Sequence, residues 1–309
     1  MAGADAALPP QLLTATVPVI VGPTGIGKSE LAFRLALALN GEIVVADSRQ
    51  VYQTLDIATN KPSRDARRRV KYHMIDFVDP RRAFNVAEFV QGANQAIDDI
   101  QQRGLVAIVE GGTMLYVDSL CDGFNLAGIP PDRSLRSELE ALGREALAAR
   151  LLAMDPDPGV DLNNPVRMIR AIEILASAGP PLRALRTRTP PRWKPLRIGL
   201  VAALEVIDHR LEVRSIEQVR RGLVDETRTA LDAGVPASAH VLTGIGYAEA
   251  LAHIRGELPA GELAAAMARS NRRYARRQLR WWRRNPLVRW FELEPDPLPA
   301  ILNYVQESS

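Results

Sequence analysis

The segment V-P-V-I-V-G-P-T-G-I-G-K-S, residues 17–29, constrains the fold of this chain more than any other segment. From Gly22 to Ser29 it follows the spacing G-x-x-x-x-G-K-[ST], which is the phosphate-binding P-loop pattern. An apolar run precedes the pattern, and an amphipathic stretch, Glu30 to Leu39, follows it. A strand, a glycine-rich turn and a helix in this order predict an α/β fold: a P-loop NTPase-like parallel sheet flanked by helices.

The residues of the glycine-rich turn suit a di- or triphosphate. Glycines let successive backbone N–H groups converge on an anion, and the helix that starts near Lys28 adds the positive end of its dipole. Lys28 brings a full charge to the outer phosphate, and the Ser29 hydroxyl is placed to hold Mg²⁺. The turn predicts a phosphate site, but it does not identify the phosphate compound or the reaction.

Two further apolar runs, Glu42 to Ala46 and Leu105 to Glu110, predict buried parallel strands. The first run ends in the polar residues Asp47-Ser48-Arg49-Gln50. Residues at the carboxyl ends of such strands face the ligand crevice. Asp47 is therefore a candidate Mg²⁺ partner or general base, with a helix N-cap as the equally weighted alternative.

Glu110 stands where an ATPase carries the acid of its Walker B strand. The second acid of that pattern is missing, and Gly111-Gly112-Thr113 follows instead. The two glycines allow a ligand or another segment to approach the backbone closely.

Composition changes near Asp122 and again near Pro195, which indicates an inserted all-helical domain over residues 122–195. Within it, Arg133 to Met154 and Val166 to Ala178 have helical composition. The sequence thus predicts a tail over residues 1–16, a core formed by residues 17–121 and 196–292, and a C-terminal tail over residues 293–309.

The single cysteine, Cys121, excludes an internal disulfide framework and fits a reducing, cytoplasmic setting. We expect this thiol to be a small buried apolar group. The start of the chain has no basic region typical of a signal peptide. No run of about 18 apolar residues exists, so we expect no membrane-spanning helix and no membrane partner.

Arginines are concentrated near the C-terminus. Residues 269–289 carry nine arginines and no acidic residue, with Tyr274, Trp281 and Trp282 among them. On a helix, one face would carry Arg269, Arg272, Arg276, Arg280 and Arg283. This pattern favours nucleic-acid phosphate binding over a solvated helix docked by its tryptophans. Upstream, Arg210 and Arg214 are spaced so that both can reach one anion.

Taken together, these segments resemble the tRNA dimethylallyltransferase family, also called IPP transferases. The matching segments, in family order, are G-P-T-G-I-G-K-S (22–29), A-D-S-R-Q-V-Y (46–52), D-I-A-T-N-K-P (56–62), E-G-G-T-M-L-Y (110–116), N-N-P-V-R-M-I-R-A-I-E (163–173), G-I-G-Y (244–247) and R-R-Q-L-R-W (276–281). The P-loop alone occurs in many families, whereas D-S-x-Q-x-Y, G-G-T-x-L-Y and R-R-Q together are specific.

The resemblance implies transfer of a dimethylallyl group from dimethylallyl diphosphate to a tRNA adenosine. The acceptor is the exocyclic N6 amine of the adenosine 3′ to the anticodon, in tRNAs that read codons beginning with U, and diphosphate is released. The implied catalytic residues are Asp47 as the base, Thr24 and Arg214. The implied diphosphate- or nucleotide-binding residues are Gly22, Pro23, Thr24, Gly25, Ile26, Gly27, Lys28, Ser29, Arg210 and Arg214, with the cofactor Mg²⁺ on Ser29.

The resemblance also implies an interface for a tRNA anticodon stem-loop, from which the adenine must be flipped out. Ser48, Gln50 and Gln278 would read the edge of the base. The full implied tRNA-binding set is Asp47, Ser48, Arg49, Gln50, Thr113, Arg136, Arg167, Arg170, Gly246, Tyr247, Arg277 and Gln278. The implied enzyme is a cytoplasmic monomer.

The chain departs from the family pattern at Ala58, Asn60, Glu110 and Ala248. Three other functions share part of the pattern. A small-molecule kinase would use the same P-loop, with Asp47 activating a hydroxyl. An RNA-binding ATPase would lack the transfer chemistry, and an adenylate isopentenyltransferase would act on free adenine nucleotides. The inserted helices and the arginine-rich segment favour tRNA as the acceptor.

Overall fold

The computed structural model of the chain describes residues 16–123, 129, 132–179, 181–185 and 190–308. The chain divides into two compact units. Residues up to 117 and from 192 onward form the larger unit, and residues 118–191 form the smaller one. The sequence analysis placed the inserted segment at residues 122–195. Of the predicted N-terminal tail, residues 1–15 lie outside the described residues, and Thr16 is already part of a strand.

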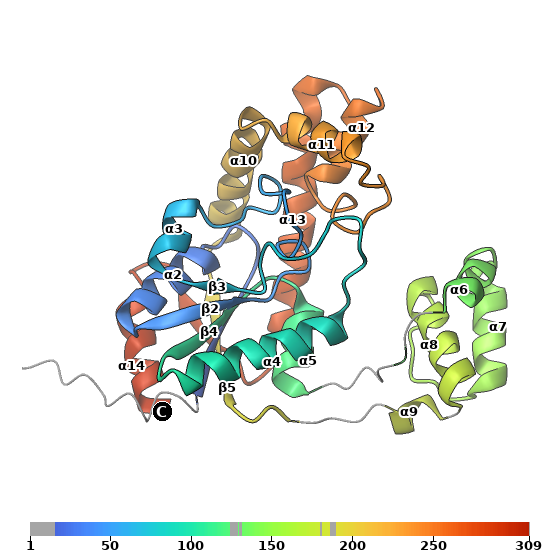
Figure 1. Cartoon of the computed structure of the whole chain (residues 1–309), viewed down its shortest axis with the longest axis horizontal. Coiled ribbons are helices and arrows are strands. Elements are labelled where there is room, and N and C mark those ends of the chain that lie inside the picture. The colour runs from blue at the N-terminus through green and yellow to red at the C-terminus, as the bar shows by residue number, and fades with distance from the viewer. Residues whose placement is uncertain (1–15, 124–128, 130–131, 180, 186–189, 309) are drawn as a thin grey trace, which may run out of the picture. The chain divides into compact units, whose positions relative to one another are not determined.

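The larger unit is built on a six-stranded sheet with the strand order β3-β2-β4-β1-β5-β6 (Figure 1). All strand pairs are parallel. The strands are β1 (Thr16–Val21), β2 (Gly41–Val45), β3 (Tyr72–His73), β4 (Val106–Glu110), β5 (Lys194–Val201) and β6 (Arg289–Glu292). Residues of the central strand β1 are all buried, which explains its apolar sequence. The predicted α/β fold is confirmed.

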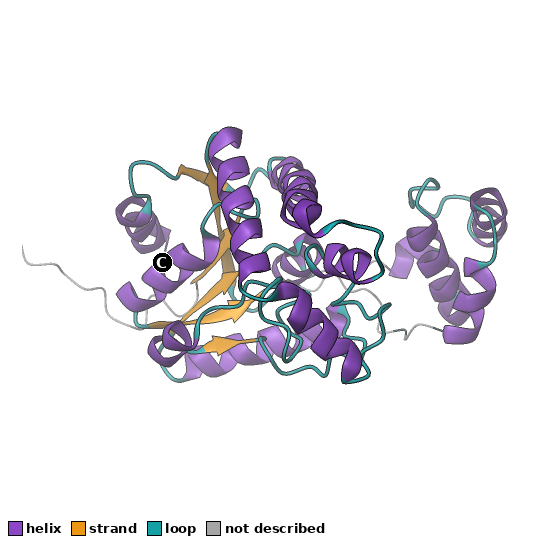
Figure 2. Cartoon of the chain, turned by 90° about the horizontal axis from the view of Figure 1, so that it is seen from above, coloured by secondary structure: helices purple, strands orange, loops and turns teal. Residues whose placement is uncertain are grey.

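Helices cover both faces of this sheet (Figure 2). In chain order, the helices that precede and follow the smaller unit's own helices are α2 (Lys28–Ala38), α3 (Arg64–Arg69), α4 (Val86–Gln102), α5 (Met114–Asp122), α10 (Leu204–Arg220), α11 (Leu223–Asp232), α12 (Tyr247–Ile254), the short 3₁₀ helix η1 (Ala260–Glu262), α13 (Leu263–Trp282) and α14 (Leu298–Ser308); not all of them lie on the sheet. Helix α4 illustrates why they form. Asn85 and Glu88 make a capping box at its start, and Phe89, Ala93, Ile97 and Ile100 lie on its buried face.

The smaller unit is helical, with α6 (Arg133–Glu140), α7 (Arg144–Met154), α8 (Pro165–Ala178) and α9 (Leu182–Leu185). The single helix predicted over residues 133–154 is therefore wrong, because two helices occupy this range. The break falls at Gly143, whose backbone is extended (φ −69°, ψ 160°). The break lets Leu139 and Leu147 both join the buried cluster around Met168 and Ile172.

The prediction of a C-terminal tail over residues 293–309 is also wrong. Helix α14 occupies most of this range, and its Ile301 and Val305 lie in the core cluster of the sheet. The sequence analysis also missed β6, which extends the sheet beside β5. Within the described residues, no helix is both long and apolar enough to cross a bilayer.

Helix α14 provides a stability test of the corrected C-terminus. We expect Ile301→Ala to lower the free energy of unfolding by about 2–5 kcal/mol, because it leaves a cavity in the core. Asn303→Ala, at an exposed position of the same helix, should change it by less than about 0.5 kcal/mol. Chemical denaturation of both variants measures the difference, and equal stabilities would mean that α14 does not contribute to the core.

Candidate active site

The carboxyl ends of three neighbouring strands bring the predicted site residues to one edge of the sheet. The P-loop follows β1, Asp47 follows β2, and Gly111 follows β4. Gly22, Gly25 and Gly27 have φ values of +143°, +85° and +106°. These are backbone conformations that residues with a side chain adopt only at a cost. A Cβ on Gly22 would also lie 2.9 Å from the carbonyl oxygen of Leu200.

Helix α2 begins at Lys28, and its N-cap Gly27 supplies no side-chain cap. The first-turn N–H groups therefore point toward the P-loop concavity, where an anion can bind them. Lys28 is 8% exposed, and its Nζ donates a hydrogen bond to the carbonyl oxygen of Pro23 at 3.0 Å. Burial lowers the pKa of Lys28 to about 8, while the negative charge of Glu110 opposes this shift.

Glu110 ends β4 and faces the start of α2. Its side chain is buried, and both carboxylate oxygens lie 3.3 Å from the Ser29 hydroxyl, which donates to them. Burial raises the pKa of Glu110 to about 7, because the charged form loses hydration; the positive charge of Lys28 opposes the rise. A buried carboxyl group thus lies next to the Ser29 hydroxyl of the P-loop.

Asp47 both caps a turn and faces the site. Its Oδ1 accepts hydrogen bonds from the backbone N–H groups of Arg49 at 2.8 Å and Gln50 at 3.3 Å. No helix begins at Asp47, so the alternative of a helix N-cap is wrong, although the side chain does cap this turn. Both bonds use the same oxygen, so the cap fixes the carboxylate without occupying Oδ2. The next residue, Ser48, donates its backbone N–H to the Thr113 hydroxyl at 2.9 Å, which links the loops after β2 and β4.

Helix α13 is hydrogen-bonded to two loops of the site, the P-loop and the loop after β4. The Gln278 side chain accepts a hydrogen bond from the Thr24 N–H at 2.7 Å and donates one to the Gly112 carbonyl oxygen at 2.8 Å. Tyr274 donates to the same carbonyl oxygen at 2.8 Å. Gln278 is fully buried, and both ends of its amide are occupied. In this structure the Gln278 amide is therefore not available for the predicted contact with the edge of a base.

Helix α10 contributes two arginines, Arg210 and Arg214, to the P-loop. The Arg214 Nη2 donates to the Thr24 hydroxyl at 3.0 Å and to the Asn271 side-chain oxygen at 3.2 Å. Burial lowers the pKa of Arg214 to about 10. Its Nε is buried and has no hydrogen-bond partner in the described part of the chain. Arg210 donates to the Ile26 carbonyl oxygen at 3.2 Å.

Other residues predicted to bind tRNA hold the surrounding loops in place. Arg49 donates to the carbonyl oxygens of His240 and, at 3.0 Å, of Val241. The Gln50 Nε2 donates to the Thr59 carbonyl oxygen at 3.2 Å, while its buried Oε1 finds no partner among the described residues.

Tyr247, one of the predicted tRNA-binding residues, is only 1% exposed. Its hydroxyl donates to Glu226 at 2.5 Å, and Glu226 accepts the backbone N–H groups of Asp56 and Ile57. The preceding Gly246 is also buried, and a Cβ there would lie 2.6 Å from the Ala58 Cβ. In this structure the Tyr247 side chain therefore supports the loop at residues 56–58 rather than facing a partner.

The face of α13 that exposes arginines differs from the predicted face, which included Arg272 and Arg276. Arg276 is paired with Asp208 through two hydrogen bonds of 2.8 and 3.0 Å, so its charge is compensated. Arg272 is partly buried and donates to the Ala268 carbonyl oxygen. The exposed arginines of α13 and the residues just after it are Arg269, Arg273, Arg277, Arg280, Arg283 and Arg284. Trp282 is fully buried, so this tryptophan docks the helix against the core. The same helix also exposes a surface of arginines, so the two features occur together.

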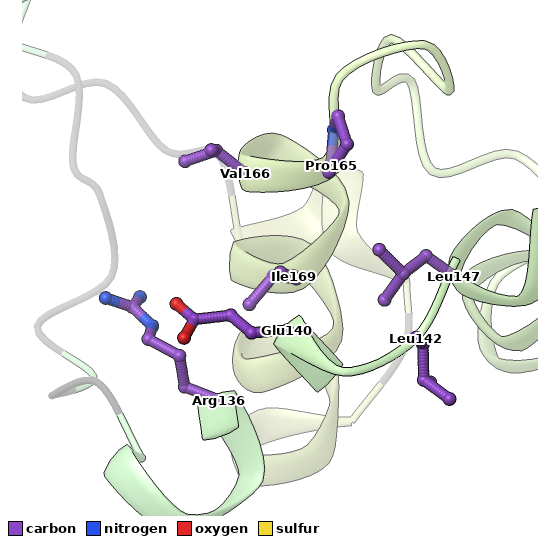
Figure 3. Close-up of a pocket in the computed structure, with 7 residues that line it drawn as sticks. All are labelled: Arg136, Glu140, Leu142, Leu147, Pro165, Val166 and Ile169. Carbon is purple, nitrogen blue, oxygen red and sulfur yellow. The ribbon is translucent and has the colours of Figure 1, made fainter. Parts of the chain in front are cut away.

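In the smaller unit, Glu173 forms ion pairs with two of the three predicted RNA-binding arginines. Arg136 binds its carboxylate at 2.7 and 3.1 Å, and Arg170 binds it at 3.4 Å and the Ile129 carbonyl oxygen at 2.6 Å. Arg167 is exposed. A pocket of about 240 Å³ adjoins Arg136 (Figure 3). Its lining consists of Arg136, Glu140, Leu142, Leu147, Pro165, Val166 and Ile169.

The sequence analysis missed several residues that complete this site. Asn271 binds Arg214, and Tyr274 binds the Gly112 carbonyl oxygen. Both lie on the face of α13 that carries Gln278, with spacings of three and four residues. That periodicity was a usable signal, but the arginines of the segment dominated the interpretation. Asp208 and Glu226 pair with residues far away in the sequence, so no local pattern indicates them.

Comparison with known proteins gives consistent results. The IPP transferase family model matches residues 50–285. The tRNA dimethylallyltransferase of Thermomicrobium roseum is 39% identical over 283 residues, covering 90% of this chain and 86% of that protein. The tRNA dimethylallyltransferase of Geobacter metallireducens is 40% identical over 296 residues, covering 93% of this chain and 95% of that protein.

Two solved structures resemble the chain along most of its length. The full-length tRNA isopentenylpyrophosphate transferase from Bacillus halodurans has a TM-score of 0.72 and 34% identity, covering 95% of this chain and 96% of that one. A eukaryotic dimethylallyltransferase acting on tRNA has a TM-score of 0.79 and 26% identity, covering 95% of this chain and 78% of that one. With its P-loop edge and its family segments in order, the chain belongs to the IPP transferase family.

Proposed function

We propose that this chain transfers a dimethylallyl group from dimethylallyl diphosphate to the N6 amine of a tRNA adenosine, with release of diphosphate. The proposed acceptor is the adenosine 3′ to the anticodon in tRNAs that read codons beginning with U. The observation that carries the proposal is the attachment of the arginine-rich helix α13 to the P-loop through Gln278, and to the loop after β4 through Gln278 and Tyr274. A small-molecule kinase has no need for such an attachment.

The P-loop and α10 are arranged to bind the donor's diphosphate. Helix α2 begins at the end of the P-loop, the Lys28 ammonium donates to the Pro23 carbonyl oxygen, and the Arg214 guanidinium donates to the Thr24 hydroxyl. In the transfer step, the bond between the allylic carbon and the diphosphate oxygen breaks, and negative charge develops on that oxygen. Positive groups fixed in a buried site stabilise this charge without reorganising. Arg214 and Thr24 are assigned to the departing oxygen, and Arg210 supports the loop behind them.

Mg²⁺ is the proposed cofactor, held by the Ser29 hydroxyl. The oxygen-only character of the side chains at this position fits a hard divalent cation. When bound, Mg²⁺ would neutralise part of the diphosphate charge.

Asp47 is the proposed general base. The N6 amine is a weak nucleophile because its lone pair is delocalised into the purine ring, so a base must take its proton while the C–N bond forms. The turn N–H groups of Arg49 and Gln50 fix Oδ1 and thereby orient the carboxylate. Ser48 and Thr113 lie beside it and are the candidates for contact with the base edge.

The proposed RNA contacts are divided between the two units. Arg277 on α13 and Arg167 on α8 are exposed, whereas Arg136 and Arg170 are held by Glu173. Flipping a base from a single-stranded anticodon loop costs less than flipping it from a duplex. We assign Gln278 and Tyr247 to positioning of the loops, and we place the reaction in the cytoplasm, carried out by a monomer.

The direct test is incubation of the chain with dimethylallyl diphosphate, Mg²⁺ and an anticodon stem-loop, followed by mass analysis of the RNA. A gain of one C5H8 unit on the adenosine 3′ to the anticodon supports the proposal. ATP turnover with unmodified RNA would indicate an RNA-binding ATPase instead. Prenylation of free AMP but not of the stem-loop would indicate an adenylate isopentenyltransferase.

We expect Asp47→Asn to lower turnover by roughly 10²–10⁴-fold, the usual contribution of a general base. Asn retains an oxygen at the Oδ1 position, so the cap on Arg49 and Gln50 remains and binding of the stem-loop should be little affected. Single-turnover rates and RNA affinity measure the two effects. Asp65→Asn, an exposed aspartate paired with Arg68, is the matched control. Joint loss of RNA binding and turnover would make Asp47 a structural residue only.

We expect Arg277→Ala to weaken stem-loop binding and to reduce the slope of log affinity against log salt concentration by about 1, because one phosphate contact is lost. Arg276→Ala on the same helix is the control, since its charge is already compensated by Asp208. Its salt slope should stay closer to that of the unaltered chain. Affinity measurements from low to moderate salt compare the variants, and identical slopes for all three proteins would contradict an RNA contact at Arg277.

A further inference from the structure

We propose that Glu110 is a second protein ligand of the divalent cation, acting together with Ser29 at the end of β4. This inference rests on the proposed function, which requires a cation beside the diphosphate. It extends that function by assigning a role to Glu110, a buried acidic side chain that contacts the Ser29 hydroxyl.

The position of Glu110 is fixed by the sheet. In the parallel register Glu110 lies opposite Ile20 of β1 and Val45 of β2, so its side chain extends from the centre of the sheet edge. Ser29 is the second residue of α2. The Ser29 hydroxyl lies 3.3 Å from each carboxylate oxygen. Good hydrogen bonds between oxygens are shorter, about 2.7–2.8 Å. The hydroxyl therefore faces both oxygens without closing a strong bond to either.

Among the described residues, Glu110 lacks the arginine partner that the other buried glutamates have. Three glutamates are buried in the described part of the chain: Glu42, Glu110 and Glu173. Glu42 binds Arg103 through two hydrogen bonds of 2.6 Å, and Glu173 binds Arg136 at 2.7 Å. Within the described residues, no lysine, arginine or histidine nitrogen lies within 4.0 Å of a Glu110 carboxylate oxygen, whereas Glu42 and Glu173 each have an arginine nitrogen within that distance.

A buried carboxylate normally has a paired cation or a metal ion. The charge of Lys28 acts on Glu110, but the Lys28 Nζ donates its hydrogen bond to the Pro23 carbonyl oxygen inside the P-loop. Mg²⁺ is typically bound by one or two carboxylates together with substrate phosphates. The carboxylate of Glu110, the hydroxyl of Ser29 and a diphosphate in the P-loop make up such a set of oxygens.

The test is a titration of the full chain with Mn²⁺, followed by electron paramagnetic resonance, with and without inorganic pyrophosphate. Glu110→Gln keeps the size of the side chain and removes its charge. We expect this variant to bind Mn²⁺ in the presence of pyrophosphate at least tenfold more weakly than the unaltered chain. Its affinity for pyrophosphate without metal, measured by calorimetry, should not decrease. Glu110→Asp, which keeps the carboxylate, should retain more of the Mn²⁺ affinity.

Glu173→Gln is the matched control, because it makes the same substitution at an equally buried glutamate of the other unit. It should leave Mn²⁺ binding unchanged. Unaltered Mn²⁺ affinity in Glu110→Gln would overturn the inference. Loss of metal-free pyrophosphate binding as well would also overturn it, because Glu110 would then only hold the P-loop in shape.

If Glu110→Gln does not fold, the unaltered chain can answer the question. Electron–nuclear double resonance on protein with ¹³C-labelled glutamate should show coupling between bound Mn²⁺ and a carboxyl carbon, and its absence would contradict the inference. None of these measurements uses a prenyl donor or RNA. Normal cation binding with no prenyl transfer would therefore count against the proposed function alone, and the reverse result would count against the role of Glu110 alone.

Discussion

The bonds from Gln278 to the backbone of Thr24 and Gly112 join the parts of this site that lie farthest apart in the sequence. Thr24 belongs to the P-loop, Gly112 to the loop after β4, and Gln278 to a helix near the C-terminus. A fully buried amide whose donor and acceptor are both satisfied holds its partners strongly, because breaking either bond leaves an unpaired buried group. A Cβ on Gly112 would lie 2.7 Å from the Gln278 nitrogen, so the glycine allows this close approach. The arginine surface of α13 is thereby fixed relative to the phosphate cradle.

The same edge of the sheet concentrates charges that the protein itself does not fully compensate. Burial lowers the pKa of Lys28 and of Arg214, and it raises the pKa of Glu110. All three shifts have the same cause, because each charged form loses hydration in the buried site. The proposed diphosphate and divalent cation would supply negative charge to the two cations and positive charge to the carboxylate. The site is thus arranged before the ligand arrives, which is the condition under which electrostatic stabilisation is most effective.

The sequence predicted those features that depend on local spacing. The P-loop from Gly22 to Ser29 and the buried strands that end near Asp47 and Glu110 both follow from neighbouring residues. The sequence did not predict features that depend on distant partners. Asp208 compensates Arg276, and Glu226 holds Tyr247, although neither pair is close in the sequence. Helix α14 is not predictable from the sequence, because its core residues Ile301 and Val305 form a short apolar pattern whose burial depends on the folded sheet.

Some arginines of this protein have an acidic partner, and others are exposed to solvent. The number of arginines in a segment does not distinguish the two groups. Arg136 and Arg276 each have a carboxylate partner within 2.8 Å, so an incoming phosphate would have to compete with that partner. Arg277 and Arg167 are exposed, and the nearest ring to Arg277 is Tyr274, 5.0 Å from its guanidinium carbon to the ring centroid. An aromatic ring orients a guanidinium without neutralising its charge. For this reason the exposed arginines, and not the arginine-rich segments as a whole, define where an RNA backbone is expected to bind.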